Sequence, residues 1–543
     1  MRYGDKILMA KSDEKDLYLL PKMANRHGLI AGATGTGKTI TLKVMAESFS
    51  DLGVPVFLAD VKGDLTGFCT AGADTEDMQK RIAQFALEDF ELKSYPVRYW
   101  DLYGEAGTPV RATVSDMGPT FFSRLLNLTA VQSGVMNIVF KAADDAGLLL
   151  YDLKDLRAML NYVGENRAEY TLSYGNISTA SIGAVQRALL AFEEEGGETF
   201  MGTPGLEIRD LIRTDYDGRG YINVLSAGKI VGSPLTYSTF LLWMLGELYE
   251  KLPEVGDPEK PRLVFFFDEA HLLFNNCTKE LISKITQTVK LIRSKGVGIY
   301  FITQSPGDVP GEVLAQLSNR VQHALHAYTP AEQKAIRAAA QGFRSNPAFK
   351  TEEILTELGV GEALVSFLDE KGVPCMVERA KILPPQSLMG PAETSVVNQI
   401  LNVDELDIKY RDAEDPESAY EILMAAREQL QQQKAQEAAA LEAEKKAQKD
   451  AVAAEKQAQK EAAAAEKEKQ KKQAERTKTA ERAVTAAATT MTRGITTNAV
   501  NSLTGGKITD TKTLSKRAAT NALNSVVRTG TTKIIRGLFG NKK

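Results

Sequence analysis

The chain has 543 residues, of which 43% are hydrophobic and 25% charged, and its formal net charge is −4. This length accommodates about two to four domains, and the composition is that of a globular protein. No apolar run reaches the roughly 18 residues of a membrane span, and the three scattered cysteines exclude a disulfide framework and a Cys-x-x-Cys zinc site. The N-terminus lacks an apolar signal segment, so we expect a cytoplasmic protein with no integral membrane span.

Charge is distributed unevenly along the chain. Residues 477–543 carry twelve Lys or Arg and two Asp or Glu, a net charge of +10, which leaves −14 for residues 1–476. A basic tail on an acidic body suggests contact with a polyanion, either nucleic acid or an anionic membrane surface. A solvated, disordered tail explains the same composition, so these interpretations stay open.

Apolar runs in the first 60 residues predict a hairpin followed by the start of a sheet. Two short runs within residues 7–20 flank a turn-like polar stretch and favour a hairpin. Residues 28–31 form a short apolar strand that leads into a glycine-rich loop and a helix over about 39–52. Residues 54–59 are continuously hydrophobic, which is typical of a strand buried in a parallel sheet.

Strands alternate with helices through the middle of the chain. Residues 116 to about 213 show apolar residues at helical spacing and are interpreted as a helical insertion. After it, strand patterns alternate with helical ones, which predicts a doubly wound parallel sheet. The expected strands are 221–225, 263–267, 298–302 and 321–328, and the expected helices are 235–252, 278–295 and 330–341.

The composition changes after Pro416. Residues 417–476 are rich in Ala, Glu, Lys and Gln, with twelve basic and twelve acidic residues, and predict a helix roughly 90 Å long. Beyond Leu441 the apolar residues are nearly all alanine, so the pattern favours a single charged helix or a weak coiled coil. The regions expected from the sequence are 1–115 and 216–400 for the two parts of an α/β core, 116–215 for the helical insertion, 417–476 for the charged helix and 477–543 for the basic tail.

A complete Walker A motif, Gly-x4-Gly-Lys-Thr, lies between the strand at 28–31 and the helix after it. Its backbone N–H groups and the helix N-terminus favour a phosphate chain, Lys38 would reach the β and γ phosphates, and Thr39 would bind Mg²⁺. A simple glycine-rich turn would not need this strand-to-helix context. The expected nucleotide-binding residues are Gly32, Ala33, Thr34, Gly35, Thr36, Gly37, Lys38 and Thr39, together with Thr41 and Asp60.

Asp268 and Glu269 follow the strand at 263–267, the most strand-like run in the chain. We expect Asp268 to hold Mg²⁺ and Glu269 to act as the general base for an attacking water. Two buried neighbouring carboxylates would be costly without a cation. The alternative is an acidic pair at a helix N-terminus.

Three further groups of polar residues are candidates for the same chemistry. Gln304, after the strand at 298–302, could sense the γ-phosphate or orient water, or could be a turn residue. Asp60, Lys62 or Asp64 could contact the nucleotide or a neighbouring subunit, or form a solvated turn. Arg320 is the candidate arginine that reaches a neighbour's γ-phosphate, with Arg344 and Arg293 as rivals and a surface salt bridge as the alternative.

With these motifs placed, residues 1 to about 390 resemble the HerA/FtsK-like P-loop ATPases, in particular the bacterial YjgR-type, HerA-like branch. The resemblance implies a RecA-like core with a mostly parallel sheet and a helical insertion, which binds ATP and Mg²⁺. It further implies a homo-oligomeric ring, often a hexamer, that translocates double-stranded DNA. The segments that carry the resemblance are 25–39, 60–65, 147–150 with 152–156, 267–271, 303–306 and 319–325, and the terminal segment 536–540 also resembles the C-terminal signature of this branch.

Two functions follow as hypotheses. The first is an ATP-driven motor that acts on double-stranded DNA, favoured by the ATPase motifs, the resemblance and the basic tail. The second is an ATP-dependent protein-assembly or remodelling scaffold that reaches a protein partner through the charged helix at 417–476, because no base-reading motif is present. A weaker third hypothesis has the end of the tail, 532–543, bind an anionic membrane.

Overall fold

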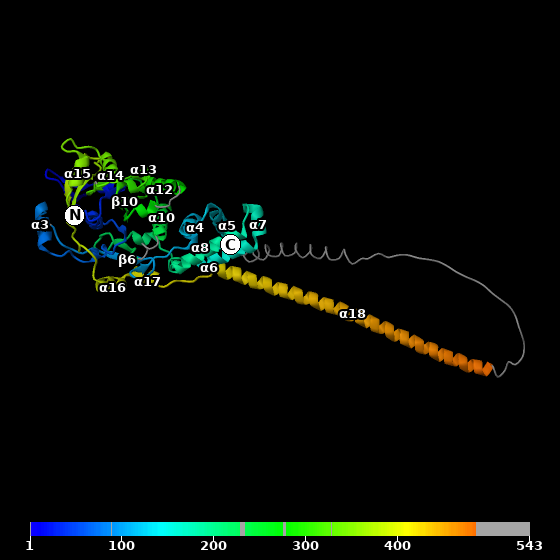
Figure 1. The fold of residues 1–543 in the computed structure, drawn as a ribbon. Helices are drawn as coiled ribbons and strands as arrows, with labels where there is room; N and C mark the ends of the chain where they lie inside the picture. The colour runs from blue at the N-terminus through cyan, green and yellow to red at the C-terminus, as the bar shows by residue number, and fades with distance from the viewer. Residues whose placement is uncertain (1, 88–89, 229–233, 275–278, 327, 485–543) are drawn as a thin grey trace. The chain divides into compact units, whose positions relative to one another are not determined.

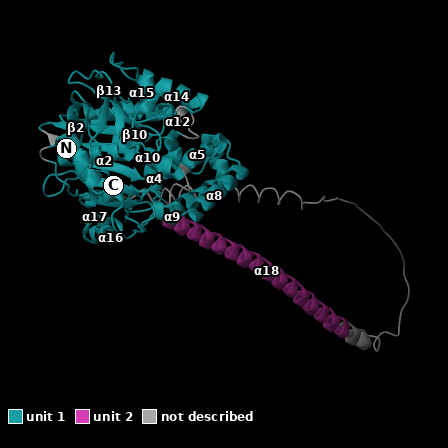
Figure 2. Cartoon of the chain, turned by 60° about the vertical axis from the view of Figure 1, so that its left-hand side comes forward, with its two compact units in different colours: residues 1–420 teal, residues 421–543 magenta. Residues whose placement is uncertain are grey.

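The computed structural model describes residues 2–87, 90–228, 234–274, 279–326 and 328–484. The chain divides into two units, residues 1–420 and residues 421–543, which are coloured separately in Figure 2. The first unit holds every expected part of the ATPase core, and residues 485–543, most of the expected basic tail, lie outside the described residues.

A mostly parallel sheet of thirteen described strands runs through the first unit (Figure 1). Its parallel part has the order β11-β4-β10-β9-β5-β8-β6-β7. These strands are β4 (Gly28–Ala31), β5 (Val56–Asp60), β6 (Val97–Asp101), β7 (Thr108–Pro109), β8 (Ile222–Ser226), β9 (Leu263–Phe267), β10 (Val297–Thr303) and β11 (Asn319–Gln322). The expected α/β core with a mostly parallel sheet is therefore confirmed.

Antiparallel strands extend the sheet beyond β11. β12 (Glu362–Ser366) pairs with β11, and β13 (Glu378–Ile382) joins β12 to β2 (Lys6–Lys11). β2 also pairs with β1 (Arg2–Tyr3) and with β3 (Asp16–Leu19), which confirms the hairpin predicted within residues 7–20. No local pattern in the sequence indicates that this hairpin extends the sheet beyond β13.

One predicted strand is too long. β11 ends at Gln322, whereas the apolar pattern predicted a strand over 321–328. Leu325 instead packs in a separate apolar cluster with Ile336 of α14 (Pro330–Gln341) and Leu355 of α15 (Thr351–Glu357). The apolar residues that follow Gln322 therefore belong to helix packing, and His323 lies just past the end of the strand.

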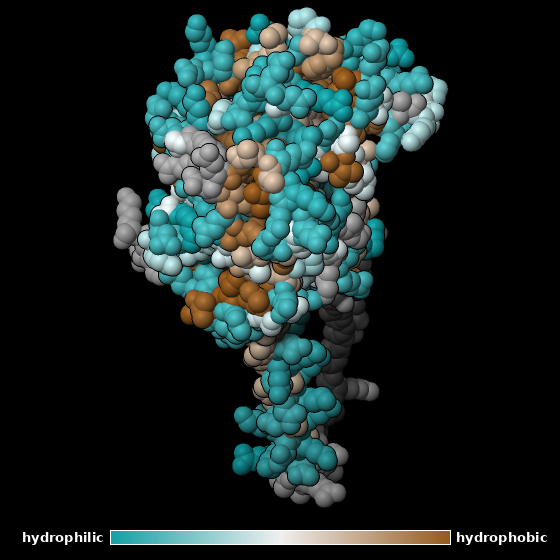
Figure 3. Space-filling model, turned by 90° about the vertical axis from the view of Figure 1, so that its left-hand side faces the viewer, coloured by the Kyte–Doolittle hydropathy of each residue, from teal (hydrophilic) through white to brown (hydrophobic). Residues whose placement is uncertain are grey.

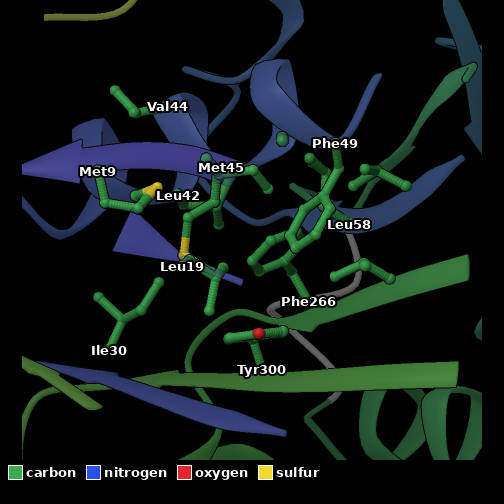
Figure 4. Packing of buried hydrophobic residues seen from close by; sticks show 14 of the residues in the cluster. Met9, Leu19, Ile30, Leu42, Val44, Met45, Phe49, Leu58, Phe266 and Tyr300 are labelled. Atoms are coloured by element: carbon green, nitrogen blue, oxygen red, sulfur yellow. The ribbon is translucent and has the colours of Figure 1, made fainter. Parts of the chain in front are cut away.

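The central strands are buried on both faces, which explains their continuous apolar sequences. All five residues of β9 are fully buried, and the rings of Phe57 and Phe265 stack at 4.7 Å between centroids. Helix α2 (Lys38–Asp51) places Leu42, Met45 and Phe49 against this sheet (Figure 4). Because α2 is held along its length, its N-terminus, which follows the glycine-rich loop, has a fixed position at the carboxyl edge of β4.

The segment between β7 and β8 is mainly helical, as the sequence predicted, and its helices lie together in Figure 1. Apolar residues such as Val139, Leu156 and Leu189 are buried between them. Asp152 caps one helix by accepting a hydrogen bond from the Asp155 amide at 3.1 Å. These helices are α4 (Val114–Leu125), α5 (Ala130–Ala146), α6 (Leu153–Glu165), α7 (Arg167–Tyr174), α8 (Thr179–Glu194) and α9 (Gly197–Phe200).

The other helices of the first unit connect strands or follow the sheet. Helix α10 precedes β9, and α11 and α12 connect β9 to β10, close to the expected boundaries. They are α1 (Pro21–Ala24), α3 (Glu76–Phe85), α10 (Pro234–Lys251), α11 (His271–Phe274), α12 (Lys279–Ile292), α13 (Gly311–Leu314), α16 (Thr394–Val403) and α17 (Glu405–Tyr410).

Helix α18 (Ala419–Val484) has 66 residues and makes up the described part of the second unit. It continues past the predicted end at residue 476, and every side chain over 431–476 is exposed. Its visible surface is mostly hydrophilic (Figure 3). Neither α18 nor any other helix in the described residues combines the length and apolar character that crossing a membrane requires.

Candidate functional site: a phosphate-binding loop facing two carboxylates

The glycine-rich loop between β4 and α2 forms one wall of a cavity of about 240 Å³. Gly35 and Gly37 have φ values of +79° and +117°, a backbone conformation that side chains with a Cβ rarely adopt. Gly37 directly precedes α2, so the free N–H groups of the first helical turn and the positive end of the helix dipole face the loop. The loop therefore has the shape and polarity to hold a phosphate chain.

Lys38 lines the same cavity and is bonded to its own loop. Its Nζ donates to the carbonyl oxygens of Gly32 at 2.7 Å and Ala33 at 2.9 Å. Burial lowers the pKa of Lys38, and the charge of Glu269 opposes this effect. The lysine is therefore held over the loop, within reach of an anion that enters the cavity.

Asp268 and Glu269 follow β9 at the carboxyl edge of the sheet. Asp268 lines the cavity with Lys38 and Thr39, and its Oδ1 accepts a hydrogen bond from the Glu269 amide at 2.9 Å. Burial, followed by the charge of Glu269, raises the pKa of Asp268 to about 7. Glu269 itself has φ +47°, a left-handed conformation that costs a non-glycine residue about 1 kcal/mol or more. Such strain is typical of functional positions.

Lys62 pairs with Glu269 across the mouth of the site. Lys62, from the segment after β5, lines the cavity, and its Nζ lies 3.3 Å from Glu269 Oε1. Glu269 Oε2 lies 3.4 Å from His271 Nδ1, yet this buried oxygen makes no hydrogen bond to any described residue. Burial lowers the pKa of Lys62, but the charges of Glu269 and Asp268 outweigh this effect, so the pKa is raised. From the sequence, Lys62 is one of three candidates in this segment, with Asp60 and Asp64.

Strand β10 lies between the strand of the glycine-rich loop and the strand of the two carboxylates. Its last two carbonyl oxygens accept hydrogen bonds from both sides, from the Gly32 amide at 3.2 Å and from the Ala270 amide at 2.8 Å. Gln304 follows directly, with an exposed side chain. Gln304, which was predicted to sense the γ-phosphate, therefore follows β10, the strand between β4 of the glycine-rich loop and β9 of the two carboxylates.

The residues of the cavity fit a magnesium ion held with a triphosphate. Thr39 and Asp268 offer a hydroxyl and a carboxylate, which are oxygen ligands of the kind that Mg²⁺ prefers. Two neighbouring carboxylates at a buried strand end are costly without a cation, and Glu269 Oε2 is buried without a hydrogen-bond donor among the described residues. The site therefore offers oxygen ligands for a divalent cation, and its buried negative charge favours binding of such a cation.

Residues 5–509 match the protein family described as "Helicase HerA-like C-terminal". The chain belongs to this HerA-like family. The match spans nearly the whole sequence and confirms the resemblance to HerA/FtsK-like P-loop ATPases. No protein of curated function matches the sequence.

Solved structures similar to this HerA-like chain include VirB4 of Thermoanaerobacter pseudethanolicus, at 16% identity and a TM-score of 0.45, covering 70% of this chain and 97% of that one. The bacterial conjugative coupling protein TrwB, lacking its first 70 residues and in complex with sulphate, is 14% identical with a TM-score of 0.46, covering 72% and 92%. TrwB in complex with ADP and Mg²⁺ is 14% identical with a TM-score of 0.42, covering 68% and 89%.

Two of the expected nucleotide-binding residues of this HerA-like chain have side chains that bond elsewhere. The Thr41 hydroxyl is buried, 2.8 Å from His323 Nε2 and 3.3 Å from the Gly37 carbonyl oxygen to which it donates. Asp60 accepts hydrogen bonds from the amides of Gly63 at 2.7 Å and Leu65 at 2.9 Å. Their geometry favours support of the loops around the cavity, because neither side chain lines it.

The expected trans-acting arginine is bonded within its own chain. Arg320 donates from Nε to Leu317 at 3.0 Å, from Nη1 to Gly342 at 2.7 Å and from Nη2 to Leu314 at 3.3 Å, in each case to the carbonyl oxygen. These bonds cap the ends of α13 and α14, and burial lowers the pKa of Arg320. Its geometry therefore favours a structural role, whereas the rival Arg344 has an exposed side chain.

Two residues of the site could not be recognised from local motifs. His323 supports the loop from below through Thr41, and Val360 lines the cavity from the turn between α15 and β12. Both approach the glycine-rich loop from segments about 300 residues away in sequence. The one available signal for Val360 is its position between Gly359 and Gly361, which is typical of a tight turn.

Proposed function

We propose that this chain is an ATP-hydrolysing ring motor that moves double-stranded DNA. The observation that carries the proposal is the single cavity lined by Lys38, Thr39, Lys62 and Asp268, with Glu269 paired to Lys62 at its edge. The HerA-like family supports an ATP-driven motor, and the related coupling protein TrwB has been solved with ADP and Mg²⁺.

Each residue of the cavity has a role in this reaction. Lys38 would leave its two loop carbonyls and bind the β and γ phosphates, while the loop amides hold the rest of the phosphate chain. Mg²⁺, held by Thr39 and Asp268, would neutralise charge on the phosphate oxygens. Glu269 would accept the proton of the attacking water, and Gln304 would orient that water beside the γ-phosphate.

The ring assembly and its hexameric state belong to the proposal. In such a ring the neighbouring subunit supplies an arginine to the γ-phosphate. The internal hydrogen bonds of Arg320 make the exposed Arg344 a stronger candidate than it was from sequence, with Arg293, 3.3 Å from Asp257, as the third. Replacing each arginine by alanine and measuring hydrolysis in mixed rings with the Glu269→Gln chain would identify the one that acts between subunits.

DNA-dependent hydrolysis tests the proposal. The ATPase rate of the full chain is measured with and without double-stranded DNA at several salt concentrations, with Glu269→Gln as the inactive control. We expect DNA to raise the rate, and the effect to weaken with salt because phosphate contacts release counterions. A rate that does not respond to DNA at any salt concentration contradicts a DNA motor, and particles that stay monomeric with ATP contradict the ring.

The exposed helix α18 favours a second candidate, an ATP-dependent protein-assembly scaffold. Its side chains over 431–476 are all exposed and carry charges of both signs, which leaves a long surface open to a protein partner. Comparison of the full chain with one that ends at residue 420 separates the two functions. If DNA neither stimulates nor binds the full chain, and truncation removes a defined protein partner, the scaffold is favoured, whereas loss of salt-sensitive DNA retention on truncation favours the motor.

A further inference from the structure

A tight turn between α15 and β12 lies at the edge of the cavity beside the glycine-rich loop. The Glu362 amide donates to the Gly359 carbonyl at 3.1 Å, and Gly361 has φ +77°, as the third position of a type II turn requires. Val360, the second position, lines the cavity together with Gly35 and Gly37. This residue is nevertheless 77% exposed. An apolar side chain is therefore presented, largely uncovered, beside a phosphate-binding loop.

The turn is fixed to the loop by backbone hydrogen bonds. The Gly361 amide donates to the Thr36 carbonyl at 3.0 Å, and a Cβ on Gly37 would lie 3.3 Å from Gly361 Cα. On its other side, the Gly361 carbonyl accepts from the Ile382 amide at 2.9 Å and from Arg81 Nη2 at 3.1 Å. The position of Val360 relative to the phosphate loop is therefore set by the sheet and not by the ligand.

The backbone N–H and C=O groups of Gly359 and Gly361, on either side of Val360, all have hydrogen-bond partners. The Gly359 amide donates to Glu362 Oε2 at 3.1 Å, and its carbonyl accepts the Glu362 amide. Both polar groups of Gly361 are bonded as well. The side chains of Val360 and Ile40, which both line the cavity, provide the apolar surface there. Such a surface can pack on the face of an aromatic ring, but it offers little to read the ring's edge.

We propose that the Gly359–Glu362 turn is the nucleobase platform of this site, with Val360 packed against the face of a purine. The assignment rests on the proposed function, since it takes the phosphates to occupy the glycine-rich loop. A nucleoside triphosphate has an anionic end and a flat apolar end, and the cavity offers Lys38 and α2 to the first and Val360 to the second. Because packing on the face of a ring does not read its edge, adenine and guanine nucleotides bind with similar affinity.

Comparing ligands with and without a base tests this assignment. Binding of ATP, GTP and inorganic tripolyphosphate, each with Mg²⁺, is measured by calorimetry on the full chain and on Val360→Ser and Val360→Phe. Val373→Ser is the matched control, because Val373 is 45% exposed at another turn and does not line the cavity. All four chains are first compared by thermal unfolding.

We expect Val360→Ser to weaken ATP and GTP binding by about fivefold to tenfold, as loss of one apolar contact implies, and to leave tripolyphosphate binding unchanged. Val360→Phe should strengthen binding of both nucleotides, because a ring stacks on the base, and Val373→Ser should change nothing. Equal weakening of ATP and tripolyphosphate in Val360→Ser, or no change for any ligand, overturns the platform. A preference between ATP and GTP above about 100-fold overturns the claim that the base edge is not read.

The outcomes also separate this assignment from the proposed function. If the unmodified chain binds tripolyphosphate but binds ATP no more tightly, the phosphate loop stands and the platform is wrong. If it binds none of the three ligands, both are wrong.

Discussion

Lys62 Nζ lies 3.3 Å from Glu269 Oε1, and this ion pair joins the segment after β5 to the residue that follows Asp268, the carboxylate proposed to hold Mg²⁺. Asp268 and Glu269 are adjacent, and the charge of Lys62 lowers the pKa of Asp268 against the effect of burial. The lysine thus partly compensates the negative charge of these two neighbouring carboxylates. It also lines the cavity proposed to hold the phosphates, so Lys62 could exchange its ion pair with Glu269 for one with a phosphate when ATP binds.

Replacing Lys62 with methionine tests this relationship. We expect kcat to fall about tenfold to 100-fold, since a positioned charge beside the reacting groups is lost. The acid limb of the rate profile should move to higher pH, because removing the positive charge of Lys62 raises the pKa of Asp268. Lys154→Met is the matched control, since Lys154 is also 49% exposed and paired with a carboxylate. An unchanged pH profile in Lys62→Met would contradict the role.

Glu269→Gln separates nucleotide binding from hydrolysis. Glutamine keeps the size of the side chain but cannot accept the proton of the attacking water, so we expect hydrolysis to fall by about 10²-fold to 10⁴-fold. ATP affinity should be retained, because Lys38, Thr39 and the loop amides are unchanged. Equilibrium binding and single-turnover hydrolysis measure the two effects. Normal turnover in this variant would refute the assignment of Glu269 as the general base.

Lys38→Ala should weaken nucleotide binding itself. Loss of the charged hydrogen bonds to the phosphates reduces ATP affinity by about tenfold to 100-fold. In the described structure Lys38 bonds only to carbonyl oxygens of its own loop, so thermal stability without nucleotide should change little. Melting curves with and without Mg-ATP therefore distinguish the variant, which should lose the stabilisation by ligand that the parent chain shows. A variant stabilised as much as the parent would contradict the role of Lys38.

Local patterns predicted the elements of the core and the two main motifs. The apolar runs located β4, β5, β9 and β10, and helix α2 begins one residue before its expected start. Each motif is a short continuous segment whose chemistry is set by its own residues, which is why a single sequence reveals it.

The order of strands and the contacts between distant segments could not be predicted in this way. The order of strands in a sheet depends on the packing of whole layers. No local sequence pattern therefore predicts that β10 lies between β4 and β9. Val360 and His323 reach the glycine-rich loop only because β11 and β12 pair beyond β4. Arg320 was predicted from its spacing to act between subunits, but the carbonyl oxygens that surround it come from α13, α14 and the segment between α13 and β11.

Arg320→Ala distinguishes a structural arginine from one that acts between subunits. Loss of three hydrogen bonds to carbonyl oxygens should destabilise the fold by roughly 2 to 4 kcal/mol. Denaturant unfolding measures this change, and Arg344→Ala, at an exposed side chain, should leave stability nearly unchanged. Unchanged stability together with abolished hydrolysis in Arg320→Ala would instead restore the role between subunits.

His323 makes the stability of the site depend on pH. The side chain is fully buried below the glycine-rich loop, with Nε2 2.8 Å from the Thr41 hydroxyl and Nδ1 3.0 Å from the Glu362 carbonyl. Burial lowers its pKa to about 4, whereas the unfolded chain has an ordinary histidine near 6.5. Between these values the unfolded state binds more protons, so the folded state loses stability as the pH falls from about 6.5 to 4, by roughly 3 kcal/mol at this site.

Comparison of the parent chain with His323→Gln isolates this effect. Asp268, whose pKa burial raises to about 7, changes stability in the opposite sense over much of the same range, and His27, with a pKa of about 4, changes it in the same sense. The pH dependence of the parent alone therefore does not report on His323. The difference in unfolding free energy between parent and variant should shrink as the pH falls from 7 to 4, because only the parent loses the contribution of this histidine. Urea unfolding across this range measures the difference, and one that stays constant with pH would show that His323 is not held neutral beneath the loop.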